Sequence, residues 1–500
     1  MLRSVRPVWV LSLALLLFVY LRWLGPAVAP YAGGSDPSGY MWSARLFRQG
    51  TLSVPINVPK GFPLDAVGLD ALTPLGGRVR PQTLTLVAVY PTGLPLHFAA
   101  ASLILEDEQA VKAVLLFVVA GVLWLLYLLG RDAGLPRLWA AAGCLLLALS
   151  PLFLFLAVQP YSDVLATFWV EAAVICAWRV RRRAAFAVLA GASLGMAALV
   201  RPTNLLFLLP VLAAMPVSAG TYARLIGGGL PFAVFVAVYQ TWAYGHPLRT
   251  GYGDVSWLFG WANVLPSLKY YLVWLPQLAS WLVVLVPAAA WGWRGPLARW
   301  RLVAGAWLVA NLGTYAGYSV TWQTWWFLRF VLPAFPILIV SGLSGLRELT
   351  QAVVRPARVP GVRHLAGAAA AVIVGLCAIA LVRTPLFDAH RAMKGSERVY
   401  RDALRTMEIG GLSSRPVLMM QLSGAANYYR PALRFLRYDF MSPAAWQAIR
   451  RWQAVEHVAI GAAVFDFELD ALFRDDTSVF PCLWQVRGRF RNMTFWECPP

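Results

Sequence analysis

The sequence predicts a polytopic α-helical membrane protein with about 11 transmembrane helices, a large first extracytoplasmic loop and a small C-terminal α/β soluble domain. The first observation behind this fold class is composition, because 59% of the 500 residues are hydrophobic and 13% are charged. Soluble proteins are about one-half apolar and about one-quarter charged. The second is the number of apolar runs long enough to cross a bilayer. The third is a rise in acidic residues after residue 384.

Each predicted span is an apolar run close to the roughly 20 residues that a helix needs to cross a bilayer. The runs lie at 8–26, 111–130, 138–158, 163–179, 184–200, 203–218, 223–244, 271–292, 302–320, 327–346 and 365–383. The first run is long and lacks a clear cleavage site, which favours a membrane anchor over a removable signal peptide. Arg201-Pro202 separates two short runs, so we expect a bent or broken helix there.

The basic residues of the short loops predict the orientation in the membrane. The chain has 43 Lys and Arg against 23 Asp and Glu, a net charge of +20. The residues that define one face are Arg3, Arg6, Arg131, Arg137, Arg179, Arg181, Arg182, Arg183, Arg224, Arg294, Arg299, Arg301, Arg347, Arg355, Arg358 and Arg363. All lie in the cytoplasm if the N-terminus is inside, as the positive-inside rule favours. The charge therefore indicates a multi-pass protein of the inner (plasma) membrane with an extracytoplasmic C-terminus, and no nucleic-acid partner.

Residues 1–384 are predicted to form the transmembrane module, and residues 27–110 within it to form a long first extracytoplasmic loop with surface or re-entrant helices. Part of this loop, residues 84–106, is fairly apolar. Its proline and glycine residues argue against a straight spanning helix. We therefore expect this stretch to stay on the outer side.

Residues 385–500 are predicted to form an extracytoplasmic α/β domain, because strand-like and helix-like runs alternate there. The strand-like runs are 417–421, 434–438, 457–460 and 485–489, and the helix-like runs are 397–407 and 443–455. Cys482 and Cys498 both lie in this domain, where an oxidising compartment permits a disulfide.

Acidic residues are scarce near the spans, so each one needs a physical reason. Only 11 of the 23 acids precede residue 385, and burying an unpaired charge near lipid is costly. Asp36 follows the first span, and Asp163 lies near the outer end of the third span. Either residue could be catalytic, or each could cap the helix that begins there. Glu171 lies two turns deeper, where a structural polar contact is the alternative.

Two arginines fall at the predicted outer boundary, where the topology does not favour cations. Arg201 precedes Pro202, and Arg329 lies in the aromatic run 325–330. A guanidinium in such a place can bind a phosphate through two parallel hydrogen bonds, or it can extend to the lipid headgroups. The residues alone leave both alternatives open.

Motifs for several other chemistries are missing from the sequence. The chain has no P-loop, no paired His or Cys metal-ligand spacing and no Gly-x-Ser-x-Gly elbow. Nucleotide-driven chemistry and zinc hydrolysis are therefore disfavoured, and no cofactor is certain. A divalent cation shared by Asp36 and Asp163 stays an option, although two acids make no specific metal signature.

An ordered series of short motifs resembles the GT-C superfamily of integral-membrane glycosyltransferases. The motifs are Ser35-Asp36-Pro37-Ser38-Gly39-Tyr40, Tyr90-Pro91-Thr92-Gly93-Leu94-Pro95, Ser162-Asp163, Arg201-Pro202-Thr203-Asn204, Gly251-Tyr252-Gly253 and Arg329-Phe330-Val331-Leu332-Pro333-Ala334-Phe335-Pro336. The bacterial branch related to protein O-mannosyltransferases and aminoarabinose transferases is the most similar. The series covers residues 1–345, and the C-terminal domain matches no motif of the superfamily.

The resemblance implies an enzyme that moves a hexosyl or pentosyl group from a polyprenyl-phosphate donor to an acceptor hydroxyl on the extracytoplasmic face. The acceptor would be a glycan, a lipid or a protein, and one displacement with Asp36 as base would invert the sugar carbon. Relatives often carry two adjacent acids in this loop, whereas Pro37 follows Asp36 here, so Asp163 is the expected second catalytic residue. The residues expected to bind substrate are Arg201, Arg329, Tyr40, Tyr90, His97, Asn204 and Tyr252.

Two other functions stay open from the sequence. A transporter or flippase of a lipid-linked sugar or another anion would explain charged residues within the membrane and broken helices. Such a protein would need neither the long first loop nor the outer domain, and no internal repeat is evident. The other alternative is a scaffold subunit whose outer domain binds a partner.

Overall fold

The computed structural model describes residues 7–56, 58–80, 83–354, 360–409, 411–412, 415–469 and 480–500. The chain forms two compact units. The helical unit comprises Met1–Val28, Lys112–Val238 and Gly253–Met393, and the mixed unit comprises Ala29–Val111, Tyr239–Tyr252 and Lys394–Pro500. The mixed unit therefore joins most of the predicted first loop to most of the predicted C-terminal domain. Of the residues used to predict orientation, Arg3, Arg6, Arg355 and Arg358 lie outside the described residues.

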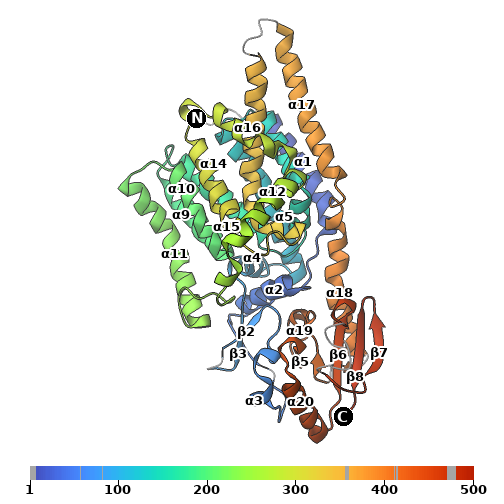
Figure 1. The fold of residues 1–500 in the computed structure, drawn as a ribbon. Helices are drawn as coiled ribbons and strands as arrows, with labels where there is room; N and C mark the ends of the chain where they lie inside the picture. The colour runs from blue at the N-terminus through green and yellow to red at the C-terminus, as the bar shows by residue number, and fades with distance from the viewer. Residues whose placement is uncertain are drawn as a thin grey trace. The chain divides into compact units, whose positions relative to one another are not determined.

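The helical unit consists of α-helices with short 3-10 and π segments between them (Figure 1). Its α-helices, two of which extend into the mixed unit, are α1 (Pro7–Leu24), α5 (Asp107–Asp132), α6 (Arg137–Ala148), α7 (Pro151–Ala157), α8 (Asp163–Arg179), α9 (Ala185–Val200), α10 (Leu208–Ala214), α11 (Ala219–Tyr244), α12 (Val264–Leu278), α13 (Val286–Gly292), α14 (Trp300–Leu308), α15 (Thr314–Ala316), α16 (Phe335–Val354) and α17 (Pro360–Arg383). The other helical segments are η1 (Gly25–Ala27), η3 (Pro202–Phe207), η4 (Ser256–Leu258), η5 (Trp261–Asn263), η6 (Trp281–Leu285), η7 (Gly295–Leu297), the π-helix η8 (Val309–Gly313) and η9 (Trp325–Ala334). Each predicted span falls mainly on helix.

Among the described residues, four helices are long and apolar enough to cross a membrane, namely Asp107–Asp132, Ala219–Tyr244, Trp325–Val354 and Val362–Arg383. α6 and α7 together make a further candidate, bent by 66° between them. Shorter apolar helices lie at Leu11–Ala27, Ala185–Val200, Pro202–Ala214 and Trp281–Gly292. The structure therefore has several apolar helices of the expected kind, but it does not confirm the predicted count of about 11 spans.

Proline breaks the helix at Arg201-Pro202, as the sequence predicts. α9 ends at Val200, and η3 begins at Pro202. Arg201 between them has an extended backbone, with φ −151° and ψ 120°, because the residue before a proline is disfavoured in the helical region. The break leaves Arg201 outside both helices, from where its side chain reaches the start of α8.

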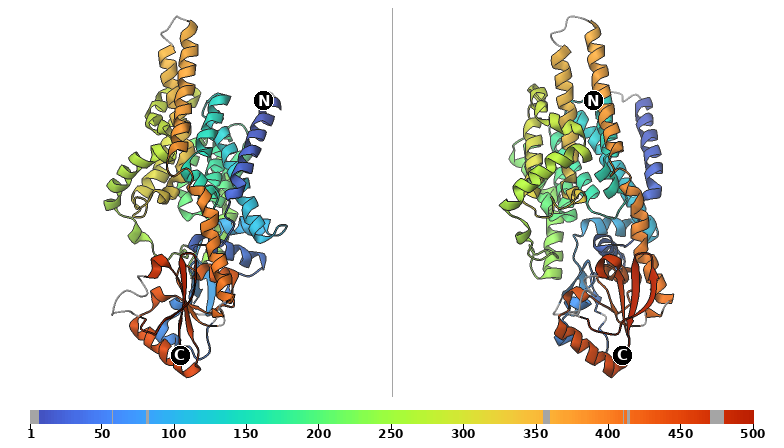
Figure 2. Two further views of the ribbon diagram at one scale, coloured as in Figure 1. Left: turned by 90° about the vertical axis from the view of Figure 1, so that its right-hand side faces the viewer. Right: turned by 45° about the vertical axis from the view of Figure 1, so that its right-hand side comes forward.

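Glycine lets helices of the helical unit approach one another closely. A Cβ added to Gly191 of α9 would lie 1.9 Å from the carbonyl oxygen of Leu225 in α11. A Cβ on Gly345 of α16 would lie 2.2 Å from the carbonyl oxygen of Leu285. α16 and α17 also lie side by side in every view (Figure 2). Larger side chains at Gly191 and Gly345 would push α9 away from α11 and α16 away from the segment that holds Leu285.

The mixed unit contains two sheets and the helices that cover them. A three-stranded antiparallel sheet has the order β1-β3-β2, and a five-stranded sheet has the order β5-β4-β6-β8-β7. In the second sheet β4 pairs in parallel with β5 and β6, whereas β8 is antiparallel to β6 and β7. The strands are β1 (Val54–Pro55), β2 (Gly77–Arg80), β3 (Thr85–Ala88), β4 (Val417–Leu418), β5 (Phe435–Leu436), β6 (Ile460–Phe465), β7 (Gln485–Phe490) and β8 (Met493–Cys498). The helical segments are α2 (Ser35–Arg48), α3 (Leu64–Val67), η2 (Asp70–Leu72), α4 (Gly93–Ala101), α18 (Ala389–Ile409), α19 (Ser423–Tyr429), η11 (Tyr438–Phe440), α20 (Pro443–Glu456) and η12 (Asp466–Glu468), with the start of α18 in the helical unit.

The sequence predicts four of the five strands of the larger sheet and misses β8. The predicted strand at 457–460 begins only at Ile460. His457 instead ends α20 in the left-handed conformation, with φ 52° and ψ 39°. A residue in this conformation ends a helix and changes the direction of the chain. The periodicity of the sequence does not reveal that His457 adopts it.

The central strand β6 is buried along its whole length because helices cover both faces of the sheet. Ile460, Ala462 and Val464 pack in one cluster with α20 and α3. Ala463 and Phe465 pack in the other cluster with α18 and α19. Successive side chains of a strand point to opposite faces, which explains why β6 reads as a continuous apolar run.

The first loop contains no spanning helix among its described residues. Residues 84–106 hold strand β3 and the helix α4, which has 9 residues and is shorter than the roughly 20 that a span needs. Phe62, Val67 and Leu72 of the loop pack in the same cluster as α20. The loop and the C-terminal part therefore share one hydrophobic core.

Cys482 and Cys498 form a disulfide that joins the segment before β7 to the end of β8. A cross-link over 16 residues lowers the conformational entropy of the unfolded chain, which stabilises the folded state by roughly 3 kcal/mol. We therefore expect Cys482→Ser to lower the thermal midpoint of the purified protein, measured by scanning fluorimetry in detergent. Dithiothreitol should lower the midpoint of the wild type and leave that of the variant unchanged. Equal midpoints in all four samples would contradict a stabilising role.

Candidate functional site

Asp36 lies in the first turn of α2, in the mixed unit. α2 begins at Ser35, and its N-cap is Gly34, which makes no side-chain capping bond. The capping alternative for Asp36 is therefore wrong, because Asp36 is already inside the helix. Ser38 helps to close this turn, since its Oγ donates to the Gly34 carbonyl over 2.8 Å.

Three tyrosines that the sequence predicts to bind substrate gather beside Asp36. Ser35 Oγ and Tyr90 Oη are 2.5 Å apart, and the Tyr90 ring lies 4.9 Å from that of Tyr40 and 5.8 Å from that of Tyr252. Burial, and next the negative charge of Asp36, raise the pKa of Tyr90 well above its ordinary value. The Tyr90 hydroxyl therefore stays protonated, so that it can act as a hydrogen-bond donor beside the carboxylate.

His97 belongs to α4, the helix that packs against α2. Its Nδ1 shares a 2.7 Å hydrogen bond with the carbonyl of Gly93, one turn earlier in the same helix. This bond orients the imidazole ring and leaves Nε2 as its second polar atom. The predicted contact of His97 with substrate remains a prediction.

The C-terminal part of the mixed unit adds Glu397 and Tyr429, to which the sequence analysis assigns no role at the site. The Gly34 backbone N–H donates to Glu397 Oε2 over 3.1 Å, and the Ala32 N–H donates to Tyr429 Oη over 3.0 Å. The segment before Asp36 is thus held by α18 and α19. One signal for Glu397 was present, because it lies seven residues before the buried Leu404 and so falls on the apolar face of an amphipathic helix.

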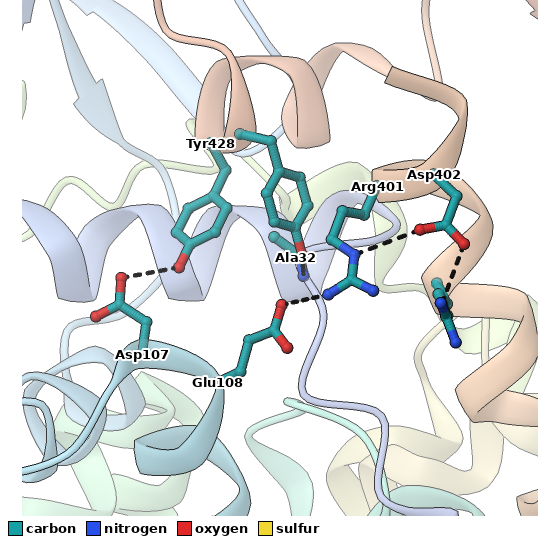
Figure 3. A network of polar contacts seen from close by, with 8 residues as sticks. Ala32, Asp107, Glu108, Arg401, Asp402 and Tyr428 are labelled. Carbon is teal, nitrogen blue, oxygen red and sulfur yellow. Dashed lines mark hydrogen bonds and ion pairs between the residues drawn. The ribbon is translucent and has the colours of Figure 1, made fainter. Parts of the chain in front are cut away.

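A network of polar contacts ties α18 to the start of α5 (Figure 3). Arg401 donates to Glu108 over 2.8 Å and lies 3.5 Å from Asp402. The guanidinium of Arg401 also lies 4.6 Å from the centre of the Tyr31 ring. Because the Arg401 side chain is only 15% exposed, this pairing is screened less than one at the surface.

A second group of contacts joins α19 to α2 and α5. Tyr428 Oη donates to Asp107 over 3.2 Å, as Figure 3 shows, and Arg45 donates to the same carboxylate over 3.3 Å. The Arg45 guanidinium stacks 3.7 Å from the centre of the Tyr428 ring. Arg45 also lines a cavity of about 240 Å³, together with Trp42 and Asn427.

Asp163 is the first residue of α8, in the helical unit, and is fully buried. The N-cap of this helix is Ser162, without a side-chain capping bond, so the capping alternative for Asp163 is wrong as well. Arg201 donates instead to Asp163 Oδ1 over 2.6 Å and to Ser162 Oγ over 3.1 Å. A buried carboxylate of this kind persists because a cation neutralises it.

Arg201 and Arg329 come together around one aromatic ring. Their guanidinium carbons lie 5.2 Å and 5.1 Å from the centre of the Phe330 ring, and that of Arg329 lies 4.8 Å from the Tyr161 ring. Tyr161 directly precedes the Ser162-Asp163 pair that holds Arg201. Arg201, between α9 and η3, and Arg329, in η9, thus form a cationic cluster beside the start of α8, of the kind that binds phosphate oxygens.

Two other polar residues of the helical unit have local surroundings. Asn204 is buried, and its Nδ2 donates to the Ala197 carbonyl over 2.9 Å, which satisfies the end of α9. Glu171 is fully buried, and neither of its carboxyl oxygens has a hydrogen-bond partner among the described residues. The polar contact considered for Glu171 is therefore not seen in the part of the chain that is described.

The two predicted acids belong to no specific metal-binding arrangement among the described residues. Within the described ranges no group of three or more His, Cys, Asp and Glu side chains could hold a metal ion. Asp36 and Asp163 belong to different units, and one oxygen of Asp163 is held by Arg201.

We expect Arg201→Met to destabilise the protein by about 3 kcal/mol or more, because it would leave Asp163 buried without its cation. The double variant Asp163→Leu, Arg201→Met should recover most of this loss, since it removes both charges together. The four thermal midpoints, measured in detergent, give the coupling between the two side chains. Additive effects of the two substitutions would contradict an energetically important pair.

Comparison with known proteins identifies the fold. No protein-family model matches the sequence, and a search of curated proteins finds no significant match.

ArnT from Cupriavidus metallidurans bound to undecaprenyl phosphate is similar in structure, with 13% sequence identity, a TM-score of 0.59 and coverage of 98% of each chain. The apo oligosaccharyltransferase of Archaeoglobus fulgidus matches at 13% identity and a TM-score of 0.53, over 94% of this chain and 70% of that chain. The archaeal oligosaccharyltransferase AglB with an inhibitory peptide and a dolichol-phosphate matches at 12% identity and a TM-score of 0.52, over 88% of this chain and 66% of that chain. Both proteins are GT-C glycosyltransferases, so the fold of this chain is the GT-C fold.

Proposed function

We propose that this protein is a membrane glycosyltransferase that transfers a sugar from a polyprenyl-phosphate donor to an acceptor hydroxyl on the extracytoplasmic face. The observation that carries the proposal is an acid, Asp36, in a turn bordered by tyrosines on a GT-C fold. The matched ArnT structure holds undecaprenyl phosphate, and the matched AglB structure holds a dolichol-phosphate. A lipid-linked phosphate is therefore the donor chemistry that the comparison favours.

In the proposed reaction the acceptor oxygen attacks the anomeric carbon, and the bond from that carbon to the phosphate oxygen breaks. The acceptor proton passes to the Asp36 carboxylate, and the bonding electrons leave with the polyprenyl phosphate. A single displacement of this kind inverts the anomeric configuration. The transferred group is a hexosyl or a pentosyl, and the acceptor is a glycan, a lipid or a protein.

Asp36 is assigned as the base because an alcohol is a weak nucleophile until its proton is taken. General-base catalysis contributes about 10²–10⁴-fold to such a step. Tyr40, Tyr90 and Tyr252 would contact the sugar, since their rings offer apolar faces and their hydroxyls offer hydrogen bonds at the edge. The first helical turn also places Asp36 where a carboxylate interacts favourably with the helix dipole.

Arg201 and Arg329 are assigned to the phosphate of the donor. Departure of a phosphate develops negative charge, and preorganised cations lower the energy of that charge. Asp163 would orient Arg201 through its 2.6 Å contact, which makes Asp163 a positioning residue rather than a second base. Asn204 is assigned to the end of α9, because its amide nitrogen is used there.

We expect Asp36→Asn to lower kcat by about 10²–10⁴-fold, since the amide cannot accept the acceptor proton. The assay incubates purified protein with a panel of polyprenyl-phosphate sugars and detects released polyprenyl phosphate. Asp65→Asn, at an exposed acid of the same unit, is the matched control and should leave the rate unchanged. A loss below about tenfold in folded Asp36→Asn would contradict its role as base. Movement of the lipid-linked sugar across vesicles without phosphate release would favour a transporter instead.

We expect Arg329→Ala to weaken binding of polyprenyl phosphate by about 10–100-fold, the usual effect of losing a charge-assisted hydrogen bond. Binding is measured by displacement of a fluorescent polyprenyl phosphate from the purified protein. Arg294→Ala, at an exposed arginine of the same unit, should bind as the wild type does. Unchanged affinity in Arg329→Ala would remove this residue from the phosphate site.

A further inference from the structure

Glu397 places a second carboxyl at the turn that precedes Asp36. It lies on the C-terminal helix α18 and is 9% exposed. Its Oε2 accepts the backbone N–H of Gly34 over 3.1 Å. A Cβ on Gly33 would lie 1.8 Å from the same oxygen. The Glu397 carboxyl therefore leaves no room for a side chain at Gly33 and binds the backbone of Gly34.

Contacts of neighbouring residues fix the helix that carries Glu397 and the turn that it binds. On α18 itself, Arg401 is one turn away and is fixed by Glu108 and Asp402. On the side of the turn, the Ala32 N–H is held by Tyr429. The Glu397 carboxyl, which is buried and accepts the Gly34 N–H, is therefore held next to the start of α2.

Asp36, Tyr400 and Glu468 are the charged and titratable groups that affect the Glu397 carboxyl or its neighbour Tyr400 among the described residues. Asp36 faces it from α2, and Tyr400 interacts with it on α18, with Glu468 acting on Tyr400 in turn. Burial, and then the charge of Asp36, raise the pKa of Glu397 to about 7, against the opposite effect of the Gly34 N–H. Glu397 is therefore neutral below about pH 7 and negatively charged above it.

We propose that Glu397 is a positioning residue of the Asp36 site, an inference that rests on the function proposed above. It fixes the Gly33-Gly34 turn, and it shares with Asp36 the proton that leaves the acceptor hydroxyl. When the acceptor O–H bond breaks, the proton goes to the Asp36 carboxylate, and the pair of carboxyls later releases it to water. The negative charge of Asp36 acts on the Glu397 carboxyl, so a charge on Glu397 acts on Asp36 in return. An ionised Glu397 adds a second negative charge where the proton arrives, which favours its uptake.

The test measures kcat of the purified full-length protein with the polyprenyl-phosphate sugar that supports turnover in the Asp36 assay. We expect the wild-type kcat to rise by up to about tenfold from about pH 6 to about pH 8, because Glu397 ionises in this range. Glu397→Gln keeps the shape and an acceptor for the Gly34 N–H but cannot ionise. Its kcat should stay flat, near the low-pH value of the wild type. Glu397→Ala loses both roles and should be slower than Glu397→Gln at both values.

Glu408→Gln is the matched control, because Glu408 lies on the same helix but is exposed and pairs with Arg430. This variant should follow the wild-type pH profile, with all proteins checked for folding by thermal midpoint. A Glu397→Gln profile that rises as the wild type does would overturn the role of Glu397 and leave that of Asp36 intact. Equal losses in Glu397→Gln and Glu397→Ala, with the wild-type slope retained, would also overturn proton sharing. Full turnover in Asp36→Asn would remove both assignments together.

Discussion

The hydrogen bond from Gly34 to Glu397 is the contact on which the Asp36 site depends. The first turn of a helix leaves backbone N–H groups without partners in the helix, and a side chain at the N-cap usually satisfies one of them. The N-cap of α2 is a glycine with no side chain to do so. The carboxyl of Glu397, 363 positions further along the chain, accepts the N–H of this glycine instead, directly before the turn that holds Asp36.

This dependence extends to the packing of the whole mixed unit. Residues of the first loop share a hydrophobic cluster with α20, and α19 packs on α2. Gly424 of α19 illustrates how close the contact is, because a Cβ there would lie 2.2 Å from Ser38 Oγ. The loop that carries the proposed base and the C-terminal segment therefore form one folded body, and neither could bury its apolar residues without the other.

In the helical unit a buried carboxylate is stabilised by an ion pair instead of by a backbone N–H. Asp163 is fully buried and pairs with Arg201, whose extended backbone before Pro202 places it outside the neighbouring helices. An ion pair in such surroundings lasts only when geometry is good and further hydrogen bonds are made. Ser162 supplies one, and the ring of Phe330 covers the guanidinium. Pro202 in this unit and Gly34 in the mixed unit thus have similar roles. Each lies close in the chain to a charged side chain that is placed at the start of a helix, Arg201 at α8 and Asp36 at α2.

The sequence by itself determined the membrane class, the helical runs, the break at Arg201-Pro202 and the candidacy of Asp36, because hydrophobicity, proline geometry and the scarcity of acids are compositional or local properties. It did not determine the number of spans, since length and composition leave the short helices ambiguous. Only the tertiary structure decided that Asp163 serves Arg201 and that Glu397 reaches Gly34. These contacts join residues 38 and 363 positions apart in the chain. No local pattern encodes which distant partner a buried carboxyl will meet, because that depends on how the helices and the sheet pack.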